Sequence, residues 1–285
     1  MRGSRVGGAL FGLVLAASCK QDPPQGKAAG SASVLALPAL VSAAPKPAPC
    51  RAIRVKGDAR TEQGPVVTMT PLDGRAWLTL ADGADVVVRH GVSSREFSLL
   101  GPGRFQPCRG GMEQVLVSGG RVKSSSGTGV RPGADFSIAT PLGYLSYGDA
   151  DLESTVEPSR WQIEVRRGDA ATVAVPGANG LPVGPLSGPN GRAIVSGRPD
   201  PLALVAHCEQ AAREAAEGAE RVLSAPDRAA LGKVAALQLG ARRKARAACA
   251  SAEASLDREQ DAVRKSRLKD QIIAAERLWR TIPLR

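Results

Sequence analysis

The residues of this chain that are able to do chemistry are few, and most of them are cysteines. Five cysteines and two histidines occur among 285 residues. His90 follows an apolar run and precedes a glycine, as a solvent-facing turn residue does, and His207 adjoins Cys208 in a helical stretch. Two histidines offer almost no material for Ser-His-Asp or Cys-His catalysis. We therefore expect no catalytic residue and no enzyme activity.

A zinc site is the alternative chemistry for these side chains. Its ligands would be His207, Cys208 and Cys249. Neighbouring residues on a helix point about 100° apart, and a fourth ligand is missing. We therefore favour disulfide bonds at the cysteines, and we expect no metal and no other cofactor.

The first residues have the pattern of an exported protein. Arg2 and Arg5 precede an apolar run over residues 6–17, and small residues then lead to Cys19. A positive start, a short apolar stretch and a small-residue cleavage site are typical of a secretory signal peptide. The run is shorter than the ~20 residues that span a bilayer. We expect residues 1–18 to be removed on export.

The five residues that end at Cys19, LAASC, resemble the processing site of bacterial lipoproteins. In that class the cysteine is lipid-modified and becomes the new N-terminus. The resemblance implies that a lipid on Cys19 holds the mature protein on a membrane of the cell envelope. Lys20, in place of Asp, indicates sorting to the outer membrane, facing the periplasm. The alternative is an ordinary signal peptide that is cut nearby.

The other four cysteines are expected to form two disulfide bonds, because an even number in an exported chain indicates pairing. Four cysteines allow three pairings. We favour Cys50–Cys108 and Cys208–Cys249, one in each candidate domain. Each bond closes a loop of roughly 40 to 60 residues, which contributes ~4 kcal/mol in the chain-entropy model.

The net charge of +11 favours anionic partners such as lipid headgroups or acidic cell-wall glycan. It is equally compatible with a composition that is simply rich in Arg. Aromatic residues make up only 3% of the chain, so the stacking partners that single-stranded nucleic acid needs are missing and no nucleic acid is expected. A possible patch for an anionic partner, with a solvated helix face as the alternative, consists of Arg242, Arg243, Lys244 and Arg246.

The organisation changes four times along the chain. Residues 19–49 are rich in Pro and Ala and predict a flexible tether. Residues 50–176 alternate short Val/Ile/Leu runs with turn residues, which predicts a β domain built as a sandwich, barrel or solenoid. Residues 177–200 are rich in Gly and Pro and predict a linker. Residues 201–285 have a helical period with an Ala-rich face, which predicts a helical hairpin near Pro226 with coiled-coil-like packing.

Part of the β region resembles the bacterial FecR-like domain. The similarity rests on residues 78–83 (LTLADG), 136–143 (FSIATPLG) and 161–168 (WQIEVRRG), and it spans about residues 66–176. It implies an extracytoplasmic, all-β module, either a sandwich or a solenoid, that contacts another envelope component. The name-giving members relay iron-transport status to a sigma factor through a membrane helix and a cytoplasmic segment. We do not expect that role here, because no segment of this sequence is apolar enough to span a membrane.

Together these features predict a two-domain, non-catalytic, lipid-anchored envelope protein that acts as a scaffold or signalling accessory. Its partner is expected to be another envelope protein, bound by the helical hairpin. The alternative is a receptor module that binds a small ligand or a glycan. The candidate contacts for that alternative are Trp77, Tyr144, Tyr147 and Trp161.

Overall fold

The computed structural model describes residues 50–109, 113–125, 136–168, 171–176, 182–186, 189, 191–224 and 228–280. The expected signal peptide (1–18) and the tether (19–49), with the expected lipid site Cys19, lie outside the described residues. All described residues belong to one compact unit, Lys46–Arg285. The expected division into a β domain and a separate helical domain is therefore not confirmed.

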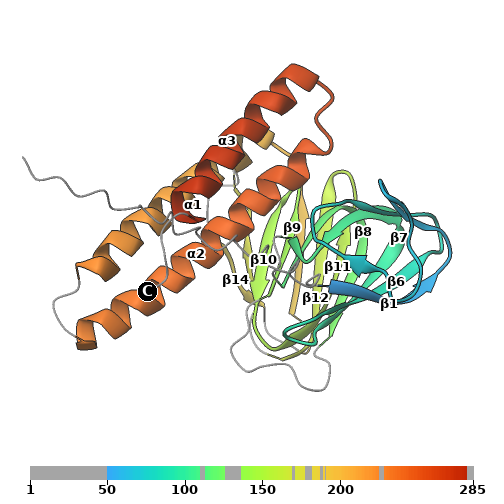
Figure 1. Cartoon of the computed structure of the whole chain (residues 1–285), viewed down its shortest axis with the longest axis horizontal. Helices are drawn as coiled ribbons and strands as arrows, with labels where there is room; N and C mark the ends of the chain where they lie inside the picture. The colour runs from blue at the N-terminus through green and yellow to red at the C-terminus, as the bar shows by residue number, and fades with distance from the viewer. Residues whose placement is uncertain are drawn as a thin grey trace, which may run out of the picture. The chain divides into compact units, whose positions relative to one another are not determined.

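The described ranges contain strands first and helices afterwards (Figure 1). The strands are β1 (Cys50–Lys56), β2 (Ala59–Thr61), β3 (Gly64–Pro65), β4 (Pro71–Leu72), β5 (Leu78–Leu80), β6 (Asp85–His90), β7 (Glu96–Pro107), β8 (Gln114–Ser125), β9 (Phe136–Thr140), β10 (Gly143–Tyr147), β11 (Ala150–Val156), β12 (Arg160–Gly168), β13 (Ala171–Ala174), β14 (Pro182–Leu186) and β15 (Gly191–Ser196). The helices are α1 (Pro201–Leu223), α2 (Arg228–Leu256) and α3 (Ala262–Arg280).

The strands form one mixed sheet that is folded into two layers. Two strands of 12 residues, β7 and β8, contribute to both layers. The start of β7 pairs with β6 and its end pairs with β5. The start of β8 pairs with β9 in parallel, and its end pairs with β11. Where the two layers meet, the register between β7 and β8 shifts between Leu100 and Arg104. Strands that change layers at such irregularities form the corners of a two-layered sheet.

Glycine makes this corner possible. Gly120 has a φ of +105°, and a Cβ at that position would lie 2.6 Å from Cζ of Phe105. A Cβ at Gly103 would overlap the carbonyl oxygen of Gly119 on the neighbouring strand. Only a residue without a side chain therefore lets β7 and β8 approach each other here.

The core between the two layers follows the alternation that the sequence predicts. Along β12, Trp161, Ile163 and Val165 are buried, while the residues between them face outward. The indole Nε1 of Trp161 donates a hydrogen bond of 2.8 Å to Oγ of Ser154, so the largest core side chain leaves no unpaired polar atom. The sequence therefore predicts the inward-facing positions of this strand correctly.

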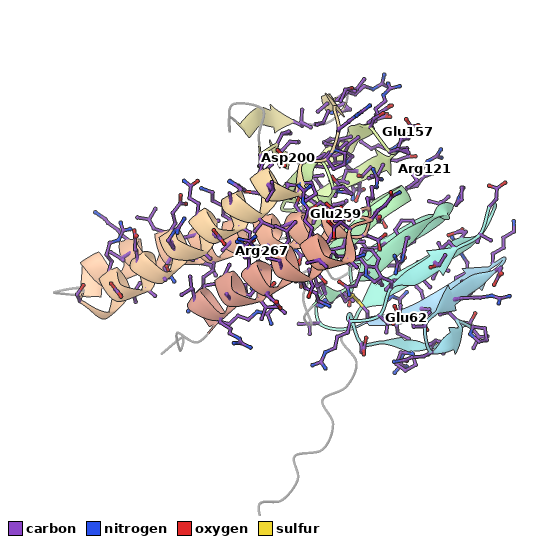
Figure 2. All side chains as sticks on the ribbon, turned by 90° about the horizontal axis from the view of Figure 1, so that it is seen from above. Glu62, Arg121, Glu157, Asp200, Glu259 and Arg267 are labelled. Carbon is purple, nitrogen blue, oxygen red and sulfur yellow. A yellow bond between two sulfur atoms is a disulfide. The ribbon has the colours of Figure 1, made fainter. Side chains whose placement is uncertain are left out.

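The helices cover the outer face of β8, β9 and β10, and α2 lies next to β9 and β10 in Figure 1. That face presents Leu116, Ala139 and Tyr144 to a second core, which the three helices complete. The chain enters α1 at Asp200, whose carboxylate accepts hydrogen bonds from the first helical N–H groups (labelled in Figure 2). The predicted pair of helices is thus part of a layer of three, in which α3 packs on both α1 and α2. The turn expected at Pro226 lies outside the described residues.

The Gly- and Pro-rich segment 177–200, expected to be a linker, contributes two strands instead. β15 pairs with β12 along its whole length, and Ala193 and Val195 are buried in the core between the layers. β14 pairs with β13. The alternation over residues 191–196 is too short to stand out among the surrounding glycines and prolines, which explains why composition suggests a linker.

Both expected cysteine pairs lie at disulfide distance. The Cα atoms are 6.0 Å apart in Cys50–Cys108 and 4.5 Å apart in Cys208–Cys249, within the range of disulfide bonds. The first bond ties β1 to the turn after β7, and the second ties α1 to α2.

The corner glycine gives a testable prediction. Gly120→Ala should lower the free energy of unfolding by about 1–3 kcal/mol, because the new Cβ meets Phe105 and the φ is positive. Gly83→Ala is the matched control, since Gly83 has a φ of +70° but open space around it. Urea denaturation measures both variants. Equal losses for the two variants would contradict the steric argument.

Candidate functional site

Several buried and half-buried charged side chains gather where the helices meet the sheet, whereas the fully buried Arg95 lies among the strands, bound to Ser124 and to the carbonyl oxygen of Ala150. At the helix–sheet contact, α2 lies flat on the strands because its inner residues are small, and Ser251 donates a hydrogen bond of 2.7 Å to the carbonyl oxygen of Thr140. Small residues allow a helix to approach a sheet closely. This contact between the layers is therefore where any functional site involving both parts would have to lie.

Near the C-terminal end of α2, Arg109 joins the sheet to two helices. Its Nε donates a hydrogen bond of 2.7 Å to Glu253 of α2, and its guanidinium lies 2.8 Å from Glu276 of α3. Burial lowers the pKa of Arg109, but the attraction of Glu253 and Glu276 outweighs burial, so that the pKa is raised. Glu276 also pairs with Arg280 at 3.0 Å. This network fastens α2 and α3 to the turn at Cys108.

About one turn further along the chain, two arginines make similar contacts. Arg104 of β7 forms an ion pair with Asp257 and lies over the ring of Trp77, 4.9 Å from its centroid. Arg258, just after α2, donates to the carbonyl oxygens of Ser118 and Pro158. Burial lowers the pKa of Arg258. The C-terminal end of α2 is thus held to the strands by Arg104, Arg109 and Arg258.

The basic cluster expected to bind an anionic partner does not form one solvent-facing patch. Arg242 is buried, and Arg246 lies over the ring of Trp279, 5.9 Å from its centroid. Burial and, after it, the nearby arginines led by Arg280 together lower the pKa of Arg246 to about 10. The interpretation as a solvated face is wrong for Arg242, because this side of α2 packs inside the molecule.

The other two members of the cluster are half-buried. Lys244 pairs with Glu214 of α1 at 2.8 Å. Arg243 also takes part in an interaction within the structure. All four residues are thus engaged with the protein itself.

The second histidine lies beside the sheet. His207 stacks on Tyr144, and its Nε2 lies 3.4 Å from the phenol oxygen. Burial lowers the pKa of His207, and Lys244 lowers it further. Burial also raises the pKa of Tyr144 to about 12, with a smaller contribution from Glu214. At neutral pH the pair therefore holds a neutral imidazole against a protonated phenol.

The pair does not extend to a metal site. Cys208 and Cys249 pair with each other, so both thiols of the zinc alternative are used. In the part of the chain that the structure describes, no group of three His, Cys, Asp or Glu side chains is placed to hold a metal ion.

The expectation for His90 is wrong, because this residue is buried and not at a solvent-facing turn. Its Nδ1 lies 3.0 Å from Oγ of Ser93 and 3.5 Å from Oε1 of Glu113. In a catalytic triad the nucleophile and the acid contact opposite nitrogens of the ring, whereas here both approach the same nitrogen. His90 is buried because it ends β6 opposite Cys50, inside the tight connection to β7.

The aromatic residues of the receptor alternative do not form an exposed cluster. Trp161, Tyr147 and Tyr144 are buried, and Trp77 is half-buried beneath Arg104. Ligand- and glycan-binding sites need ring faces open to solvent. The structure therefore does not bring these four residues together as a binding surface.

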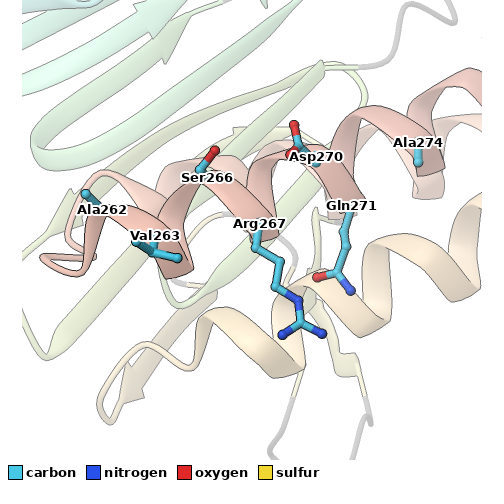
Figure 3. A pocket seen from close by; sticks show the side chains of 7 residues that line it. All are labelled: Ala262, Val263, Ser266, Arg267, Asp270, Gln271 and Ala274. Carbon is cyan, nitrogen blue, oxygen red and sulfur yellow. The ribbon is translucent and has the colours of Figure 1, made fainter.

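A shallow hollow lies along α3 (Figure 3). Its described lining comes from one helix alone, and Asp270 stands within it. One face of a single helix cannot enclose a small molecule, and a carboxylate there disfavours an anion. The lining residues are Ala262, Val263, Ser266, Arg267, Asp270, Gln271 and Ala274.

Comparison of the chain with known protein families, with curated proteins and with solved structures finds no match. Within the described ranges, no helix is long and apolar enough to cross a membrane.

The sequence did not reveal the residues that join the helices to the sheet. Arg109, Glu253 and Glu276 are separated by long stretches of sequence, and nothing in their immediate neighbourhood marks them. The one available signal was the position of Arg109 directly after Cys108. A charge next to a disulfide is held in place, and it therefore needs a partner when it is buried.

We expect Arg109→Met to lower the free energy of unfolding by about 3 kcal/mol, because Glu253 and Glu276 lose their buried cation. Adding Glu253→Gln and Glu276→Gln to that variant should restore most of the loss, since no carboxylate is then left without the Arg109 cation and Arg280, the other partner of Glu276, is exposed to solvent. Chemical denaturation of the single and triple variants measures both effects. A triple variant no more stable than the single one would rule out the electrostatic explanation.

His207 gives a prediction for pH dependence. Because its folded pKa is lowered, the unfolded chain binds more protons once the pH falls below the ordinary value of 6.5. The free energy of unfolding is therefore highest above pH 6.5 and decreases as the pH falls toward the folded pKa. His207→Gln should flatten this decrease between pH 7 and 5, measured by thermal and urea unfolding. Parallel pH profiles for both proteins would contradict the assignment.

Proposed function

We propose that this chain is a lipid-anchored protein of the cell envelope that acts by binding other proteins and not by catalysis. Its acyl chain is attached to Cys19, and the molecule faces the periplasm, with the outer membrane as its location. The β region is a FecR-like module, and the helices carry the surface that contacts a partner. Its role is that of a scaffold or signalling accessory.

The proposal rests on the partners of the arginine and histidine side chains, which belong to the protein itself. The arginines at the layer contact, Arg104, Arg109 and Arg258, all bind acidic groups or carbonyl oxygens of the protein itself. His90 and His207 are buried or half-buried against neighbours of their own chain. Groups used in this way hold two layers together and leave the outer helix faces for partners.

The exposed apolar residues of the helices are a second support. Leu237 and Leu239 of α2 are exposed, and the neighbouring Ala235 and Ala236 are exposed as well. Exposed apolar side chains that lie close together mark surfaces that bind other proteins. The glycan alternative has no comparable support, because its aromatic contacts are mostly buried.

Metabolic labelling with a fatty-acid analogue tests the anchor. The label should appear on the wild-type chain and disappear in Cys19→Ala, and mass spectrometry should find the mature N-terminus at residue 19. Lys20→Ala is a matched control that should keep the label. An unlabelled wild-type chain with Met1 intact would refute the lipid anchor and the location.

Partner binding is tested separately by crosslinking the full chain in intact cells. A photoreactive residue is placed at an exposed position of the helices, and a second variant carries it at Ile194 of β15 as the control. Recovery of one protein in a fixed ratio to the chain from the helical position supports the proposal. Equal recovery from both positions, or recovery of glycan alone, contradicts it.

A further inference from the structure

The α1–α2 pair extends beyond the rest of the helical layer. α3 ends at Arg280, and next to this end Trp279 lies beneath Arg246 of α2. Residues 215–224 of α1 and 228–241 of α2 lie beyond this end of α3, and Figure 1 shows α1 and α2 continuing together past it. We call these residues the α1–α2 projection. At 1.5 Å per residue, the α2 part is about 20 Å long.

The projection is a well-packed pair of helices. Gln238 is buried and donates a hydrogen bond of 2.8 Å to the carbonyl oxygen of Ala215. A Cβ at Gly218 would overlap the side chain of Gln238, so the two helices are in close contact. Ala215 and Ala219 are buried in this seam. The pair therefore presents a defined surface to its surroundings.

That surface is apolar on α2. Residues 229–241, AALGKVAALQLGA, contain one charged residue, Lys233. Leu237 is 75% exposed and Leu239 is 45% exposed, and the neighbouring Ala235 and Ala236 are exposed as well. A solvent-facing helix normally carries charged residues on its outer side. A helix with so few charges needs a partner to bury its apolar residues.

The charge distribution indicates which partner this surface of α2 binds. The chain carries a net charge of +11, so two copies repel each other over most of their surface. Residues 215–241 are an exception, because three acidic and three basic residues balance there to zero: Glu217, Glu220, Arg221, Asp227, Arg228 and Lys233. This is a place where two copies can approach without electrostatic cost.

We propose that the α1–α2 projection binds a second copy of this chain, and that two projections form an antiparallel four-helix bundle. A two-fold axis places α1 of one copy against α2 of the other. Glu217 and Glu220, which are exposed on α1, then meet Lys233, which is exposed on α2. Leu237 becomes buried, because it lies four residues after Lys233 on the same side of α2, and the small residues Ala236 and Gly240 beside it permit close contact between the helices. The inference deepens the proposed function by naming one protein partner, but it does not depend on the lipid.

Light scattering of the full chain in a non-ionic detergent tests the proposal. The wild-type protein should have the mass of two copies, and Leu237→Asp should raise the dissociation constant roughly 100-fold, because a charge would be buried in the bundle. Val263→Asp is the matched control, since Val263 is 80% exposed on α3 and lies outside the projection. Circular dichroism should show both variants folded.

A charge exchange adds a second, independent readout. Lys233→Glu should weaken the dimer, and Lys233→Glu combined with Glu217→Lys and Glu220→Lys should restore it. A wild-type chain that has the mass of one copy at about 100 µM overturns the proposal. So does a dimer that survives Leu237→Asp.

The Cys19→Ser chain separates this inference from the proposed function. It should still form dimers, because the projection and not the acyl chain makes the contact. If only the acylated chain associates, the inference is wrong while the anchor stands. If no acyl chain is found and the dimer persists, the anchor is wrong while the inference stands.

Discussion

The structure depends on burying the outer face of β8, β9 and β10. A sheet with apolar residues on both faces cannot leave one of them in water, and here Leu116, Ala139 and Tyr144 occupy the second face. The Ala-rich half of α2 covers them because its side chains are small enough to let the helix lie close to the strands. The other helices then pack on α2. Arg109 and Arg258, which both act near the C-terminal end of α2, fix its position.

Local patterns predicted much of this fold. Alternation identified the strand at Trp161, and the helical period after residue 200 located α1 and α2. The two cysteine pairs found at disulfide distance could be chosen because each joins residues in the same part of the chain. These features are encoded over a few residues, or by the scarcity of cysteine, and both can be recognised in a single sequence.

The contacts between distant parts of the chain could not be predicted in the same way. The sequence 177–200 has the composition of a linker, yet its strand β15 is held by pairing with β12, a partner that no local pattern reveals. Arg242 has a charge that suggests a solvated face, but its environment is set by helices from other parts of the chain. Burial and salt bridges between distant residues depend on the whole fold, and the candidate site consists mainly of such contacts.

The bond between Cys50 and Cys108 also has a mechanical consequence. Tension applied to the chain ahead of Cys50 divides at the disulfide between β1 and Cys108, and at Cys108 it divides again between β7 and Arg109. Part of that load therefore reaches α2 and α3 through Glu253 and Glu276 without first peeling β1 away from β6. The helices thus share a pull on the amino-terminal side with the strands from its onset.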